Sequence, residues 1–111
     1  MVTEASVKVR LCAVDELETD AGRLMRAEGR AIAVFRVGDE VFALDNVCPH
    51  WRGPLSEGAV SATRLEVTCP WHRFRFDLRT GRNVLSDLRA GAKVYPVEID
   101  KNGDVLVTIG D

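Results

Sequence analysis

The chain has 111 residues, 46% of them hydrophobic and 29% charged, which is typical of one small globular domain. Its formal net charge of −2 gives no electrostatic reason to expect nucleic acid or an anionic membrane as a partner. Because no run approaches the roughly 18 apolar residues of a membrane span, and the first residues lack an apolar signal segment, we expect a single domain over residues 1–111 in the cytoplasm.

The first part of the chain predicts strands and little helix. Residues 7–11 (VKVRL) alternate apolar and charged side chains, as a half-buried strand does. A denser apolar run over residues 29–37 predicts a more buried strand, and a turn at residues 38–39 pairs it with a strand at residues 41–45. Residues 13–29 hold two glycines and no sustained helical period, so we expect at most one turn there.

The later part of the chain continues the same pattern. Residues 65–69 alternate, and residues 74–82 indicate a strand followed by a turn. Residues 94–100 and 105–110 predict a terminal hairpin, with Asn102-Gly103 as its two-residue turn. Together these segments predict a small antiparallel all-β fold.

Two similar loops stand out because each combines one cysteine with one histidine. Cys48 and His50 are two positions apart. Cys69 and His72 are three positions apart, and eighteen residues separate the two pairs. Thiolate and imidazole ligands suit zinc, copper or iron–sulfur chemistry. A structural zinc site is the alternative, but its common pattern places two cysteines in one loop and two histidines on a helix. One sulfur and one nitrogen per loop suit a two-iron cluster whose irons have different ligands.

These loops resemble the Rieske [2Fe-2S] family, most of all the soluble Rieske-type ferredoxins of ring-hydroxylating dioxygenase systems. The motifs that carry the resemblance are CPH at 48–50, GPL at 53–55 and CPWH…FDLRTG at 69–81. The resemblance implies an all-β fold with a β-sandwich or barrel-like base. A cluster-binding subdomain at about residues 46–83, made of the two loops, would be attached to this base.

The resemblance also implies one [2Fe-2S] cluster per chain and identifies its ligands. Cys48 and Cys69 would bind one iron. His50 and His72 would bind the other. Cys12 is not part of the motif, and we expect it to be a small buried apolar residue of the first strand.

An electron carrier, not an enzyme, is the function that the resemblance implies. Such a carrier takes one electron from a flavin-dependent, NADH-consuming reductase and passes it to a terminal oxygenase. The sequence agrees, since it has neither a glycine-rich dinucleotide fingerprint nor a second histidine and carboxylate set for a mononuclear iron. We expect a free carrier to be a monomer.

The alternative is the small subunit of a nitrite-reductase-like assembly. Two departures from the ferredoxin pattern favour it: Arg73 stands where relatives commonly have glycine, and residues 83–95 lack the prolines that many relatives have there.

Apolar residues beside the ligands predict a docking face for the oxygenase. This face would include Trp51, Leu55, Trp71 and Phe74. Arg52 and Arg73 would add positive charge that steers an acidic partner, although solvated surface charge is the simpler interpretation.

The neighbours of the ligands predict a low reduction potential. High-potential Rieske proteins carry a disulfide at positions that correspond to Gly53 and Trp71, and serine and tyrosine hydroxyls at positions that correspond to Phe74 and Phe76. Fewer hydrogen bonds to the cluster stabilise its reduced state less. We therefore expect a potential of roughly −150 mV, not the roughly +300 mV at the other end of the Rieske range.

Overall fold

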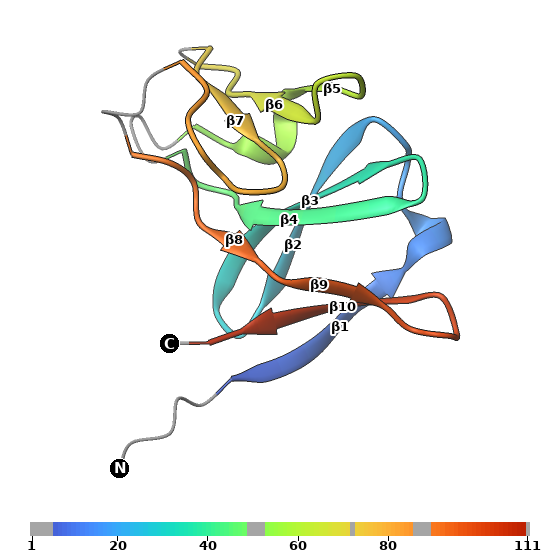
Figure 1. Ribbon diagram of the computed structural model, residues 1–111. Coiled ribbons are helices and arrows are strands. Elements are labelled where there is room, and N and C mark those ends of the chain that lie inside the picture. The colour runs from blue at the N-terminus through green and yellow to red at the C-terminus, as the bar shows by residue number, and fades with distance from the viewer. Residues whose placement is uncertain (1–5, 49–52, 72, 86–89, 111) are drawn as a thin grey trace.

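A computed structural model describes residues 6–48, 53–71, 73–85 and 90–110. Within these ranges the chain is built of short antiparallel strands (Figure 1). The strands are β1 Val7–Ala13, β2 Ala21–Ala27, β3 Arg30–Val37, β4 Glu40–Asp45, β5 Ala59–Ser61, β6 Glu66–Thr68, β7 Arg75–Asp77, β8 Val94–Tyr95, β9 Val97–Ile99 and β10 Asp104–Ile109. Two single 3₁₀ turns, η1 Val14–Glu16 and η2 Leu55–Glu57, are the helical elements of the described ranges. No helix in these ranges has the length and apolar character to span a membrane. The predicted all-β class is confirmed.

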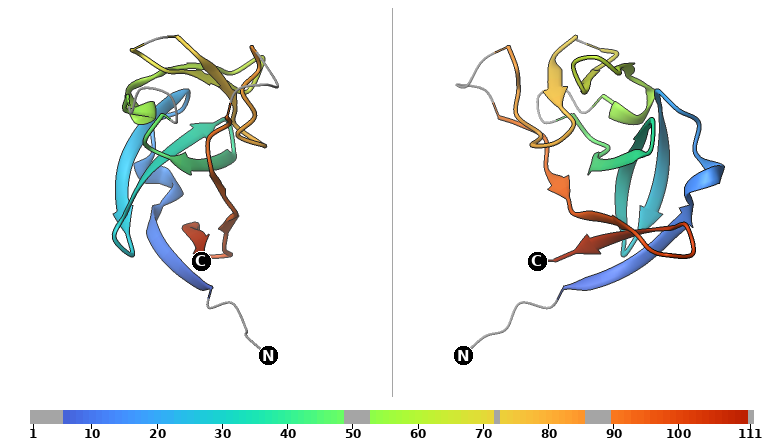
Figure 2. Two further views of the ribbon diagram at one scale, coloured as in Figure 1. Left: turned by 90° about the vertical axis from the view of Figure 1, so that its left-hand side faces the viewer. Right: turned by 45° about the vertical axis from the view of Figure 1, so that its right-hand side comes forward.

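Three antiparallel sheets make up the fold. One has the order β1-β10-β9, the second β2-β3-β4-β8 and the third β5-β6-β7. The first two sheets form the base around one apolar core, to which β10 contributes Val105, Val107 and Ile109 by strict alternation. The third sheet lies at the end of the molecule away from strands β1 and β10 (Figure 2).

Strand β3 is shared between the base and the third sheet. Its residues Ile32 and Val34 belong to the core of the base. Ala33 and Phe35 point to the other side, into a second core beneath the third sheet. All four side chains are fully buried. The dense apolar run of this segment therefore reflects a strand that is covered on both faces.

Two strands were not predicted. Strand β2 pairs with β3 over its whole length, but only Ala27 of its seven residues is buried, so its sequence has little apolar periodicity. The turn that joins them, Glu28-Gly29, has positive φ at both residues, as two-residue hairpins of the primed type require. Strand β5 is only three residues long and too short for a pattern.

The prediction of a two-residue turn at Asn102-Gly103 is wrong. Strand β9 ends at Ile99 and β10 begins at Asp104, so four residues form the loop. The Asp100 carboxylate accepts hydrogen bonds from the amides of Asn102 (2.9 Å) and Asp104 (3.0 Å), and this side chain stabilises the wider turn. Pro96 also divides the expected strand, since β8 pairs with β4 and β9 with β10.

Gly22 lies where β2 packs against η2, and it provides a first test of the fold. A Cβ at this position would lie 2.6 Å from Phe35 Cε1 and 2.6 Å from the backbone oxygen of Ser56. We expect Gly22→Ala to lower the free energy of unfolding by about 1–3 kcal/mol, because the base and the second core must separate to admit the methyl group. Chemical denaturation measures this difference.

Gly110→Ala is the matched control for Gly22→Ala. Its Cβ would meet Ser6 Cβ at 3.6 Å, an ordinary contact, so the stability should change by less than about 0.5 kcal/mol. Equal stabilities of the two variants would show that the β2–η2 contact is looser than the structure has it.

Candidate metal centre

The structure brings the two predicted cysteine ligands into one apolar environment. Cys48 follows strand β4 and Cys69 follows strand β6, so they come from different parts of the chain. Both have no exposed surface, and both belong to the second core together with Phe76 and Leu55. Thiols in such a place are shielded from water and from solution oxidants.

The first loop is closed by backbone hydrogen bonds. The amide of Cys48 donates to Gly53 O at 2.9 Å, and the amide of Leu55 donates to Asn46 O at 2.7 Å. The side chain of Asn46 is buried, and its Oδ1 accepts from the amide of Ser56 at 2.9 Å. Asn46 is therefore a positioning residue that the sequence did not reveal, although an asparagine before a tight loop often has this role.

The second loop is a tighter turn around Cys69. The amide of Cys69 donates to Phe74 O at 2.8 Å, and the amide of Arg73 donates to Cys69 O at 3.0 Å. This turn holds Arg73 at φ 61°, in the left-handed region. A residue with a Cβ loses about 1–2 kcal/mol there relative to the usual helical region.

Gly53 shows how closely the two loops approach. A Cβ on Gly53 would lie 3.0 Å from Cys69 Sγ and 3.3 Å from Trp71 Cβ. The position without a side chain thus leaves room beside the cysteine sulfur. It also places Gly53 opposite Trp71, as expected if these are the positions that carry a disulfide in high-potential relatives.

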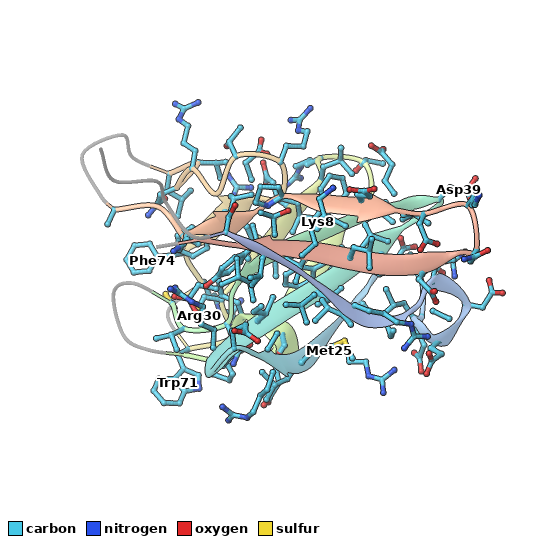
Figure 3. All side chains as sticks on the ribbon, turned by 90° about the horizontal axis from the view of Figure 1, so that it is seen from below. Lys8, Met25, Arg30, Asp39, Trp71 and Phe74 are labelled. Atoms are coloured by element: carbon cyan, nitrogen blue, oxygen red, sulfur yellow. The ribbon has the colours of Figure 1, made fainter. Side chains whose placement is uncertain are left out.

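The other predicted site residues differ in whether the structure describes them and in how exposed they are. His50, Trp51, Arg52 and His72 lie outside the described residues. Trp71 is 60% exposed, whereas Phe74 is half-buried at the edge of the second core (Figure 3).

The prediction that Leu55 belongs to a docking face is wrong. This side chain is fully buried in the second core, because η2 turns it inward against β3. It stabilises the loop from below, and a partner cannot reach it.

Cys12 is separated from the candidate site, as predicted. It lies in β1 and is buried in the core of the base. Burial, together with the nearby charge of Glu16, raises the pKa of the Cys12 thiol, so this group stays protonated and is a poor ligand.

Asp77 organises the turn after β7. Its Oδ1 accepts from the amides of Arg79 (2.7 Å) and Thr80 (3.2 Å), and its Oδ2 pairs with the Arg79 guanidinium at 3.0 Å. Burial alone would raise the pKa of Asp77, but the hydrogen bonds and charge of Arg79 and the Thr80 amide outweigh it and lower this pKa. The turn predicted after the strand within residues 74–82 is confirmed, with Gly81 at φ 76°.

Two buried cysteines, one on a loop after the base strand β4 and one after β6 of the small sheet, are a pair of sulfur ligands that a metal centre could use. A model of the Rieske-like [2Fe-2S] domain matches residues 8–108, so the chain belongs to this family. Its cofactor is accordingly a [2Fe-2S] cluster, and buried thiols beside a glycine gap fit such a group.

Three known proteins illustrate the similarity. The anthranilate 1,2-dioxygenase ferredoxin subunit of Burkholderia cepacia is 39% identical over 100 residues, which is 90% of either chain. The structure of a putative NADH-dependent nitrite reductase small subunit from Mycobacterium tuberculosis has a TM-score of 0.87 at 28% identity, over 95% of this chain and 96% of that one. The complex of reduced oxygenase and oxidized ferredoxin in carbazole 1,9a-dioxygenase contains a chain with a TM-score of 0.80 at 30% identity, over 90% and 91%.

Proposed function

We propose that the protein is the ferredoxin component of a ring-hydroxylating dioxygenase system and carries one electron at a time. The observation that carries this proposal is the match to a dioxygenase ferredoxin subunit over nine-tenths of both chains. The protein is then a component of a multicomponent oxidoreductase and not an enzyme by itself.

Cys48, His50, Cys69 and His72 are the cluster ligands in this proposal, one sulfur and one nitrogen from each loop. When bound, the [2Fe-2S] cluster supplies a one-electron couple. The chain itself buries both thiolates and so excludes water from them. It holds the two loops closed by the hydrogen bonds from the Cys48 amide to Gly53 O and from the Cys69 amide to Phe74 O.

The partners proposed are a flavin-dependent ferredoxin reductase and a terminal oxygenase. Trp71 and Phe74 lie at the same end of the molecule, and both follow Cys69 closely in the sequence, so they could supply apolar contact area near it (Figure 3). A structure similar to this chain is a ferredoxin in complex with its oxygenase, which supports docking of this kind. We further propose that the carrier is a cytoplasmic monomer.

A second candidate function is the small subunit of a nitrite-reductase-like enzyme. The high TM-score of the Mycobacterium tuberculosis protein favours it. The higher identity to a dioxygenase ferredoxin, 39% against 28%, favours the first candidate. Size-exclusion chromatography of the native protein separates the two, since a carrier elutes alone and a subunit elutes with a large partner.

Spectroscopy of anaerobically purified protein tests the cofactor and the ligands. We expect a coloured protein that, after reduction with dithionite, gives an electron paramagnetic resonance signal with the low average g of mixed cysteine and histidine ligation. A colourless protein that holds zinc would contradict both the cluster and the carrier function.

A further inference from the structure

Charge is distributed unevenly along the molecule. The described residues between 46 and 95 include the third sheet and parts of both loops, and they contain six arginines and lysines but only three aspartates and glutamates. The other described residues contain seven basic and eleven acidic side chains. The cluster-binding end is thus positive although the chain as a whole is negative. Asp39 lies at the end opposite Trp71 and Phe74 (Figure 3).

Most of the described acids of this end lie beside an arginine. Glu66 pairs with Arg75 at 3.7 Å, and Asp77 pairs with Arg79 at 3.0 Å, so two of the three described acids have basic neighbours. The third is Glu57. Four further cations among the described residues of this end are exposed to solvent: Arg64, Arg73, Arg82 and Lys93.

Arg73 is the cation whose position calls for an explanation. Its φ of 61° is one that glycine adopts freely and arginine does not. The turn requires this conformation, because the Arg73 amide donates to Cys69 O at 3.0 Å. Glycine would make the same hydrogen bond without strain, so the backbone gives no reason for arginine. Strained residues are common at functional sites, and Arg73 lies in the turn that holds the candidate ligand Cys69.

The side chain of Arg73 also borders the surface nearest the candidate ligand. Together with Glu57, Thr68, Cys69 and Pro70 it lines a surface recess, next to the exposed Trp71. A carboxylate on a partner could enter this recess and meet the guanidinium, which binds carboxylates with two parallel hydrogen bonds.

We propose that Arg73 directs the cluster-binding end of the protein toward a carboxylate-rich face of its redox partner. The proposal rests on the proposed carrier function. The charge separation would orient the molecule during approach, so that the cluster-binding end meets the partner first. Association and electron transfer would then slow as salt screens these charges.

Small charged oxidants test the local field without a partner protein. The dithionite-reduced protein, freed of excess reductant, is mixed in a stopped-flow instrument with hexacyanoferrate(III), a trianion, or with hexaamminecobalt(III), a trication. In each reaction one electron leaves the reduced [2Fe-2S] cluster and the metal of the oxidant goes from the trivalent to the divalent state. The ratio of the two rates reports the charge near the part of the surface from which the electron leaves the protein.

Arg73→Gln should lower the rate with hexacyanoferrate about 3-fold at low salt and raise the rate with hexaamminecobalt by a similar factor. Glu57→Gln, in the same recess, should shift the ratio in the opposite direction. Lys101→Gln removes the same charge from the turn between β9 and β10 and should leave the ratio unchanged. Equal ratios in the wild type and in the Arg73 and Glu57 variants would overturn the proposal.

Thermal unfolding separates the charge of Arg73 from its backbone strain. Arg73→Gly should raise Tm by about 5 °C relative to Arg73→Gln, because only glycine relieves the left-handed φ. If the two variants had the same Tm, the strain that supports the proposal would be absent. Spectra recorded before the kinetics show whether each variant holds its cluster, so failure of the carrier function is distinguished from failure of this proposal.

Discussion

Replacement of Cys69 by serine is expected to abolish the visible absorption of the protein and its reduced paramagnetic signal. Cys69 is fully buried, and its sulfur lies beside the gap left by Gly53. A serine alkoxide is harder and far more basic than a thiolate, so the hydroxyl stays protonated and is a poor substitute for thiolate on iron. We expect cluster content, measured as iron and acid-labile sulfide per chain, to fall more than about tenfold.

Cys12→Ser is the matched control for Cys69→Ser. Both residues are buried cysteines that follow or lie in a strand, but Cys12 belongs to the core of the base. Its replacement should leave the spectrum intact and lower stability only moderately, by about 1–3 kcal/mol for an added buried hydroxyl. If Cys12→Ser lost the cluster and Cys69→Ser retained it, the proposed ligand assignment would be wrong.

Loss of the cluster should also lower the thermal stability of the Cys69 variant. Metal binding contributes to folding when the ligands are brought together only in the native state. The two loops connect distant segments, since Cys48 follows β4 and Cys69 follows β6. We therefore expect the apoprotein to lose order first in the second core and to keep the base, a difference that amide hydrogen exchange can resolve.

The two candidate loops were easier to recognise in the sequence than the strands around them. Paired cysteine and histidine loops are a chemical pattern, and they can be recognised without knowledge of packing. The structure places Cys48 and Cys69 in one core as expected. The two histidines lie outside the described residues, so their role as ligands stays a prediction.

The strands that were missed are those whose sequence carries little periodicity. Strand β2 exposes most of its side chains and is held by backbone pairing with β3, which the sequence cannot display. The dense apolar run of β3 predicted a strand. It did not reveal why the run is so apolar, which is that a core covers each face of this strand. Leu55 was misplaced for the same reason, since proximity to a ligand in sequence does not tell which way a side chain points.

The surroundings of the thiols explain why the potential is expected to be low. Phe76 is fully buried in the same core as Cys48 and Cys69, and Phe74 is half-buried next to them. Neither ring carries a hydroxyl group that could donate to a cluster sulfur or to a ligand sulfur. Because such hydrogen bonds stabilise the more negative, reduced state, their absence lowers the potential. The expected value for the wild type is roughly −150 mV.

Phe76→Tyr is expected to raise this potential by tens of millivolts, up to about 100 mV. A hydrogen bond to a charged group contributes about 1.5–3 kcal/mol, and 59 mV corresponds to about 1.4 kcal/mol for one electron. The potential reports only the difference between the hydrogen-bond energies of the reduced and oxidised states, so the observed shift corresponds to part of the full hydrogen-bond energy. The sign is positive because the hydroxyl stabilises the reduced state more than the oxidised state. Protein-film voltammetry or a redox titration followed by circular dichroism measures the shift.

Phe42→Tyr provides the control for the added hydroxyl. Phe42 lies in β4, packs against the edge of the second core and is partly exposed, so its hydroxyl can reach water. Phe42→Tyr adds the same hydroxyl oxygen as Phe76→Tyr, but it should leave the reduction potential unchanged.

A wild-type potential well above zero would contradict the expectation that missing side-chain donors set the value. If Phe76→Tyr retained its cluster with no upward shift, position 76 would not face the sulfur atoms, and the apolar core around the thiols would have to account for the low potential.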